Sequence, residues 1–238
     1  MIILGINGSP RRMNTYKLIK MVLDGVKKSR PDAETDMLTV SDYDLSPCVG
    51  CCDCLFKEPW KCIQKDDLPK IQKKILDADA FVVGTPVYEW QLTGTLKILM
   101  DRTVTWTHAM PLTGRYGVVA NTIAAPGFCA ADTNEYLKRW MTMIGLTVVG
   151  ELAVYARAGY EAMGKDNIPI EDHRGVREDA FELAEKLVSA MEEKPTYLPT
   201  GDDLRRWNIV KEKVEYMGGD DLERWKNMGW LDKAYWSL

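Results

Sequence analysis

The chain begins with the stretch IILGINGSPRRMNT at residues 2–15, in which an apolar run leads directly into a polar turn. Residues 2–6 are typical of a buried strand, and the Asn-Gly-Ser-Pro sequence at 7–10 indicates that this strand ends in a turn. From residue 15 to residue 28, apolar side chains recur every four residues with lysines between them, which predicts an amphipathic helix. A strand, a turn and a helix therefore follow one another at the start of the chain.

The same alternation of strands and helices continues further along the sequence. The pattern predicts strands at residues 35–40, 81–83, 116–122 and 147–154, and helices at about 66–76, 93–102, 133–144 and 177–191. Five strands that alternate with helices predict a parallel sheet with helices on both sides, which is a doubly wound α/β fold. In such a fold, ligands bind beyond the carboxyl ends of the strands.

The last part of the chain, residues 194–238, has a different character. It holds four of the eight tryptophans, and the stretch GDDLRRW at 201–207 recurs as GDDLERW at 219–225. Two short helices, each begun by an aspartate cap, are the simplest interpretation. We therefore expect one domain at residues 1–193 and a Trp-rich helical C-terminal extension at 194–238. The tryptophans either pack this extension onto the domain or a neighbouring subunit, or they shape the mouth of an active site.

Composition and charge argue against several classes of function. The net charge is −4 and no long basic run occurs, so nucleic acid and anionic membranes are not expected as partners. The N-terminal stretch is too short and uncharged for a signal peptide, and no apolar run approaches the roughly 20 residues that span a bilayer. We expect a cytoplasmic protein. The only histidines, His108 and His173, offer little material for a histidine-based hydrolase site, and His108 is expected on the surface.

Five of the six cysteines fall in a loop at residues 48–62. Four of them, Cys48, Cys51, Cys54 and Cys62, follow the pattern C-x2-C-x2-C-x7-C, with which a short loop can wrap an iron–sulfur cluster. Because disulfides are disfavoured in the cytoplasm, this clustering indicates metal or redox chemistry. Zinc is an alternative, although structural zinc ligands usually come as two separated pairs. The thiols could also stay free or act as a redox switch, and Cys52 is a surplus thiol that could replace a ligand or point away.

The turn after the first strand has the composition of a phosphate-binding loop. It is neither the G-x-G-x-x-G of dinucleotide-binding loops nor a Walker loop, because no Gly-Lys-Ser/Thr closes it. Ser9, Asn14 and Thr15 offer short hydrogen-bonding side chains at a helix N-terminus, and Arg11 offers a charge-assisted donor. This combination favours a terminal monophosphate, as on FMN. The alternative is that Ser9, Asn14 and Thr15 only cap the helix.

A second loop, TPVYEW at residues 85–90, follows the third strand and could lay backbone amides and an aromatic ring against a flat ligand. The alternative is that Tyr88 and Trp90 are aromatic residues with ordinary partial burial. Taken together, GSPRxxNT at 8–15 and TPVYxxxxTGxLKxxxDR at 85–102 resemble the NADPH-dependent FMN reductase branch of the flavodoxin-like proteins. With the cysteine loop between its second strand and second helix, the chain is most similar to the iron–sulfur flavoproteins. The resemblance covers about residues 1–190 and leaves the C-terminal extension without a counterpart.

This resemblance implies a flavodoxin-like fold that binds FMN and a [4Fe–4S] cluster. It implies FMN contacts from three loops, at Ser9, Arg11, Asn14, Thr15, Thr85, Pro86, Val87, Tyr88, Trp90, Ala125 and Gly127. It implies that Cys48, Cys51, Cys54 and Cys62 ligate the cluster. The third FMN loop, around Ala125, departs from the more glycine-rich pattern of the family. The resemblance also implies a homodimer or homotetramer in which the cluster of one subunit faces the flavin of another.

The expected function is that of an FMN-dependent oxidoreductase. NAD(P)H or reduced ferredoxin would deliver electrons to the flavin, and the cluster would pass single electrons to an acceptor. No catalytic protein side chain is expected, because the flavin carries the reaction. Two alternatives remain open, namely an NAD(P)H-dependent flavin or quinone reductase without a cluster, and a non-catalytic electron carrier that resembles flavodoxin.

Overall fold

The computed structural model describes residues 1–57, 61–124, 129–156, 169–195 and 201–234. Its centre is one five-stranded sheet, in which all neighbouring strands are parallel and the order is β2-β1-β3-β4-β5. The strands are β1 (Ile2–Asn7), β2 (Glu34–Thr39), β3 (Ala80–Gly84), β4 (Tyr116–Ile123) and β5 (Thr147–Tyr155). This order and direction confirm the predicted doubly wound, flavodoxin-like sheet.

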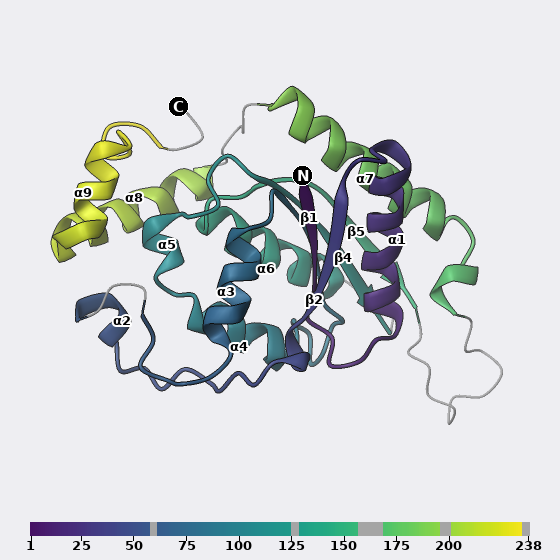
Figure 1. The fold of residues 1–238 in the computed structure, drawn as a ribbon, viewed down its shortest axis with the longest axis horizontal. Helices are drawn as coiled ribbons and strands as arrows, with labels where there is room; N and C mark the ends of the chain where they lie inside the picture. Colours follow the sequence, from purple (N-terminus) through teal and green to yellow (C-terminus); the bar gives the residue numbers. More distant parts are fainter. Residues whose placement is uncertain (58–60, 125–128, 157–168, 196–200, 235–238) are drawn as a thin grey trace.

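Helices cover both faces of the sheet (Figure 1). One face packs against α1 (Asn14–Ser29) and α7 (Val176–Glu193), and the other against α3 (Leu68–Leu76), α4 (Gly94–Arg102) and α6 (Cys129–Met143). Successive side chains of a strand point to opposite faces, so Val82 joins the first core whereas Phe81 and Val83 join the second. All of β3 is buried, as expected for a central strand that is covered on both sides.

The strand order creates a crevice between β1 and β3. From β1 the chain moves outward to β2, and it then crosses back to β3 on the other side of β1. The connections after β1 and β3 therefore leave the carboxyl edge of the sheet in opposite directions, and ligands bind at such a switch point. Gly8 permits a close approach here, because a Cβ atom at this position would lie 2.9 Å from the Cβ of Leu96 in α4.

The C-terminal extension forms α8 (Gly201–Met217) and α9 (Gly219–Asn227), which pack on the domain beside α5 (Trp106–Ala109). Three of its tryptophans, Trp207, Trp225 and Trp230, form a hydrophobic cluster with Met110 of the domain. The extension therefore packs onto the domain, which is one of the two roles expected for its tryptophans. The first helix is longer than expected. The predicted aspartate cap of α9 is wrong, because the N-cap is Gly218, whose φ of +67° turns the chain between the two helices.

The remaining short elements are η1 (Val40–Asp42), η3 (Ile170–Asp172) and α2 (Asp53–Phe56), and α2 lies inside the cysteine loop. Most predicted strands and helices lie within two residues of the observed bounds. Helix α6 begins earlier than predicted, at Cys129, which the sequence pattern had placed in the preceding loop. Of the helices in the described ranges, none is both long enough and apolar enough to cross a membrane.

Candidate functional site

A cavity at the carboxyl edge of the sheet brings two of the predicted FMN loops together. Seven of the predicted contacts line it: Ser9, Arg11, Asn14, Thr15, Pro86, Val87 and Tyr88. Met13, Thr122, Ala124 and Ala156 complete the lining. The two loops follow β1 and β3, the strands on either side of the switch point. Two further predicted contacts, Ala125 and Gly127, lie outside the described residues.

The loop after β1 is shaped by the side chain of Asn7, which is fully buried. Asn7 Oδ1 accepts a hydrogen bond from the Ser9 backbone N–H at 3.1 Å, and Asn7 Nδ2 donates to the Ser9 carbonyl at 3.2 Å. Ser9 Oγ in turn accepts from the Arg11 N–H at 3.1 Å. The N-cap residue of α1 is Met13, whose side chain makes no cap hydrogen bond. The polar residues of this loop therefore do not occupy the capping position, which weakens the interpretation that they serve only as caps.

The loop after β3 is tied to the neighbouring strand and to α4. Thr85 is fully buried, its N–H donates to Asn121 Oδ1 at 2.8 Å, and its Oγ1 accepts from the Thr93 N–H at 3.2 Å. The Val87 N–H donates to the Thr122 carbonyl at 3.0 Å. Thr85 is not among the described residues that line the cavity, and its hydrogen bonds fix the loop that carries Pro86, Val87 and Tyr88.

Tyr88 and Trp90 belong to a tight turn beside the cavity. Tyr88 and Gln91 exchange two backbone hydrogen bonds of 2.7 and 3.0 Å, and Glu89 and Trp90 between them both have positive φ. This left-handed backbone is costly for residues other than glycine. Trp90 is 64% exposed and, within the part of the chain that is described, does not line the cavity. The turn therefore presents an exposed aromatic ring next to the site, and only Tyr88 reaches the lining.

Two polar residues at the end of β4, which the sequence analysis did not single out, connect the loops. Thr122 Oγ1 lies 2.6 Å from Thr15 Oγ1 in a buried hydrogen bond. Asn121 accepts from Thr85 and donates through Nδ2 to Asn134 Oδ1 at 2.6 Å. A signal for them existed, because polar residues end an otherwise apolar strand at the edge of the sheet where ligands bind.

Thr93 belongs to the motif at residues 85–102 but was assigned no role there, and it joins the two loops to α4. Its Oγ1 donates to the Gly8 carbonyl at 2.6 Å and accepts from the Leu96 N–H at 3.2 Å, so it caps α4. The start of α4 is thereby fixed to the loop after β1 as well as to the loop after β3.

The five clustered cysteines line a second cavity, of about 380 Å³, at the C-terminal end of α4. All five thiols are free; Cys48, Cys51 and Cys52 are exposed, and Cys54 and Cys62 are half-buried. Across the described ranges, no group of three or more histidine, cysteine, aspartate or glutamate side chains is arranged to hold a metal ion. The structure thus gathers the predicted ligands around one cavity without a preformed single-ion site.

The surroundings of Cys54 and Cys52 differ. Burial raises the pKa of the Cys54 thiol, and the charges of Cys62, Cys48 and Cys51 raise it further. Cys52 occupies the N-cap of α2 with a left-handed φ of +59°, and its Sγ donates to the Gly50 carbonyl at 3.6 Å.

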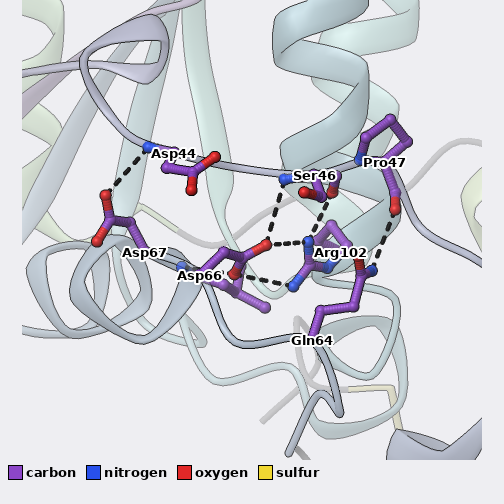
Figure 2. Close-up of polar contacts among 8 residues, drawn as sticks. Asp44, Ser46, Pro47, Gln64, Asp66, Asp67 and Arg102 are labelled. Carbon is purple, nitrogen blue, oxygen red and sulfur yellow. Dashed lines mark hydrogen bonds and ion pairs between the residues drawn. The ribbon is translucent and has the colours of Figure 1, made fainter.

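The two ends of the cysteine loop are fastened to each other by hydrogen bonds at its neck (Figure 2). The Asp67 carboxylate accepts from the Asp44 N–H at 3.0 Å, and the Asp67 N–H donates to the Asp44 carbonyl at 2.9 Å. Closer to the cysteines, Gln64 Nε2 donates to the Pro47 carbonyl at 3.1 Å. These contacts hold residues 44–47 beside residues 64–67.

Arg102, the last residue of α4, closes the neck between these contacts (Figure 2). Its side chain is fully buried, and that of Asp66 is 4% exposed. Nη1 and Nη2 donate to the two carboxylate oxygens of Asp66 at 2.6 and 3.0 Å, and Nη1 also donates to the Ser46 carbonyl at 2.6 Å. Burial alone would raise the pKa of Asp66, but hydrogen bonds from Arg102, Leu68 and Ser46 hold it below its ordinary value.

His108 is 1% exposed, so the expectation that it lies on the surface is wrong. Helix α9 covers it: Trp225 Nε1 donates to the His108 carbonyl, and Asp221 Oδ2 lies 3.6 Å from His108 Nδ1. The expectation failed because residues 106–109 form α5, against which the helices of the C-terminal extension pack. Thr107 of α5 lines the cysteine cavity, so α9 packs against a helix that borders this cavity.

Comparisons with known proteins agree with this architecture. The model of the family described as NADPH-dependent FMN reductase matches residues 1–161. An iron–sulfur flavoprotein of Archaeoglobus fulgidus is 29% identical over 234 residues, which cover 95% of this chain and 98% of the relative. Another iron–sulfur flavoprotein of the same organism is 31% identical, covering 78% of this chain and 96% of the relative. The first alignment extends into the C-terminal extension, so the expectation that this extension has no counterpart is wrong.

Solved structures share the fold. RosB, solved with bound 8-demethyl-8-formylriboflavin-5'-phosphate, is 15% identical with a TM-score of 0.60, over 92% of this chain and 88% of its own. An NADH:FMN oxidoreductase is 21% identical with a TM-score of 0.55, over 79% of this chain and 89% of its own. These identities are low, so the two structures show the fold alone. The match of the family model over more than half of the chain, together with the relatives above, shows that the chain belongs to the NADPH-dependent FMN reductase family and is related to the iron–sulfur flavoproteins.

Proposed function

We propose that this protein is an FMN-dependent oxidoreductase whose flavin site is the cavity at the carboxyl edge of the sheet. The observation that carries the proposal is that seven residues predicted to contact FMN, from two loops distant in sequence, line one cavity. Membership of the NADPH-dependent FMN reductase family and the position at the switch point of the sheet support it.

The residues of the first loop suit the terminal phosphate of FMN. Arg11 supplies a positive charge, and Ser9, Asn14 and Thr15 supply short polar side chains. The N-terminus of α1 adds backbone N–H groups and the positive end of the helix dipole. Residues 86–88 would border the flavin ring, held in place by the hydrogen bonds from β4. When bound, FMN supplies one- and two-electron redox chemistry, and these residues bind and orient it.

We further propose that Cys48, Cys51, Cys54 and Cys62 hold a [4Fe–4S] cluster. The donor set fits, because four free thiols share one cavity wall and thiolates are the usual ligands of such clusters. The names of the relatives from Archaeoglobus fulgidus support the same assignment. When bound, the cluster supplies one-electron transfer.

NAD(P)H or a reduced ferredoxin is the proposed electron donor, and a homodimer or homotetramer is the proposed assembly.

A flavin or quinone reductase without a cluster is the second candidate. The observation that favours it is the exposure of Cys48, Cys51 and Cys52, which leaves these thiols accessible for redox exchange instead of ligation. In that case the flavin site would act alone.

Anaerobic reconstitution of the full chain, with flavin, iron, sulfide and zinc measured per chain, tests both halves of the proposal. We expect about one FMN, about four iron and about four sulfide per chain. A flavin-containing protein with less than about one iron per chain would contradict the cluster and favour the second candidate. A protein that takes up no FMN would contradict the first half. Steady-state oxidation of NADH and NADPH with a small acceptor then separates a reductase from a carrier, which would not turn over.

A further inference from the structure

Helix α4 ends at the cysteine cavity. Its start is fixed to the loop after β1 through Thr93, whose Oγ1 donates to the Gly8 carbonyl. At its other end, Met100 and Asp101 line the cavity together with the five clustered cysteines. The last carbonyl groups of a helix carry the negative end of its dipole. The proposed cluster site therefore lies at the negative end of α4.

Asp101 brings a charged side chain into the lining of this cavity. The other described residues of the lining are the five cysteines, apolar residues, Gly50 and the neutral polar residues Gln64 and Thr107. A carboxylate beside thiolates is electrostatically unfavourable, because both groups carry negative charge. The carboxylate of Asp101 therefore adds to the charge of the proposed thiolate ligands and does not compensate for it.

Lys97, which lies one helical turn before Asp101, compensates part of this charge. Its Nζ forms an ion pair with the Asp101 carboxylate. The two side chains are 44% and 45% exposed, so water screens both charges in part. Lys97 is not among the described residues that line the cavity. The ion pair therefore presents its negative member to the cysteines.

We propose that Asp101 lowers the reduction potential of the iron–sulfur cluster through the negative charge that it places in the wall of the cluster site, and that Lys97 limits this effect. This inference rests on the proposed [4Fe–4S] cluster. A cluster gains one negative charge on reduction, so a neighbouring carboxylate disfavours the reduced form and a neighbouring ammonium group favours it. Because a lower potential makes the reduced cluster a stronger electron donor, Asp101 suits the cluster to pass its electron onward.

Variants that each remove one charge test the inference on the reconstituted full chain. At a fixed potential, Asp101→Asn should shift the ratio of reduced to oxidised cluster about threefold toward the reduced form, which corresponds to about 28 mV for one electron. The shift is modest because water and salt screen a partly exposed side chain. Lys97→Gln should shift the ratio toward the oxidised form. Asp101→Glu keeps the charge and should keep the wild-type potential.

Asp77→Asn is the matched control. Asp77 pairs with Lys73 at 2.6 Å across the same spacing of four residues, at the C-terminal end of α3, and both side chains are exposed. Neither residue is among the described residues that line the cysteine cavity. Asp77→Asn should therefore keep the wild-type potential. A shift as large as that of Asp101→Asn would overturn the inference, because the effect would not depend on the cavity.

The reduction potential is measured by anaerobic titration with electron paramagnetic resonance, and iron is counted in each variant. A raised potential in Asp101→Asn supports the inference, and an unchanged or lowered one overturns it. If Asp101→Asn holds no cluster, a lowered potential in Lys97→Gln supports the inference and an unchanged or raised one overturns it. Loss of iron from both variants overturns it too, because the ion pair then only holds the end of the helix. Wild-type protein with less than about one iron per chain would instead overturn the proposed cluster and this inference with it, while leaving the FMN proposal standing.

Discussion

The flavin cavity and the cysteine loop are built in different ways. The wall of the cavity is hydrogen-bonded to the sheet at several points, through Thr15 and Thr122 and through Thr85 and Asn121. The cysteine loop is fastened at its neck, and beyond the neck it carries exposed residues such as Val49, which is 66% exposed. A preformed site binds its ligand with little reorganisation, whereas a metal loop of this kind gains order from its ligand. We therefore expect flavin binding to survive loss of the cluster.

Replacing Cys48 with serine is the strongest test of this difference, and it should remove nearly all of the iron while FMN stays bound. The cluster would lose one of its four thiolates, whereas no hydrogen bond of the flavin cavity would change. Cys52→Ser is the matched control and should keep its iron, because Cys52 is not among the four proposed ligands and its Sγ donates to the Gly50 carbonyl. Iron, sulfide and flavin per chain are measured after anaerobic reconstitution. Equal loss of iron in both variants would contradict the assignment of Cys52, and joint loss of FMN would contradict the independence of the two sites.

Arg11→Ala should raise the dissociation constant of FMN by roughly 10- to 100-fold. This is the change in affinity that usually follows the loss of a hydrogen bond to a charged group. Arg12→Ala is a neighbouring control, because Arg12 pairs with Asp42 at the surface and does not line the cavity. Flavin affinity is measured by fluorescence quenching on the flavin-free protein. Equal affinities of the two variants would show that the loop after β1 does not bind the phosphate.

Thr122→Val should lower the free energy of unfolding of the flavin-free protein by about 1 kcal/mol, because Thr15 Oγ1 loses its buried partner. The double variant Thr15→Val with Thr122→Val is the control, since replacing both partners by apolar groups of the same shape is nearly neutral. Urea unfolding of the wild type, both single variants and the double variant completes the cycle. Additive effects of the two substitutions would show that the hydroxyl pair does not hold the cavity together.

Local sequence pattern accounts for the sheet and for the positions of both loops. Residues 2–15 form the predicted strand, the turn and the start of the helix. They could be predicted because burial of one face makes apolar residues recur at short intervals, which a short stretch of sequence reveals. The pair of Arg102 and Asp66 joins positions 36 residues apart, and no local pattern encodes such a pairing. The burial of His108 likewise depends on Trp225, which is 117 residues away. Asn121 and Thr122 were within reach of sequence reasoning, because polar residues seldom end a buried strand without a partner.

The neck of the cysteine loop should respond to acid, with the smallest of these effects. In the folded protein, hydrogen bonds hold the pKa of Asp66 below its ordinary value of about 3.9 in the unfolded chain. The ionised carboxylate therefore stabilises the fold at pH values above its ordinary pKa. This contribution is lost as the pH falls through the lowered pKa of the folded protein. The free energy of unfolding of the cluster-free wild type should thus fall more steeply below about pH 4 than that of Asp66→Asn.

Urea unfolding at a series of pH values checks this slope, with Asp36→Asn as the control. Asp36 pairs with Lys74 and its side chain is half exposed, so this variant should keep most of the wild-type slope because an exposed pair contributes little. If the free energy of unfolding depends less on pH in Asp66→Asn alone, the neck stabilises the cysteine loop even without a cluster. The flavin cavity differs in this respect, because its hydroxyl and amide contacts are neutral and do not titrate in this range. If the free energy of unfolding has the same pH dependence in the wild type and in both variants, the neck adds no acid-sensitive stability. The two sites would then differ only in that the cysteine loop gains order from its ligand.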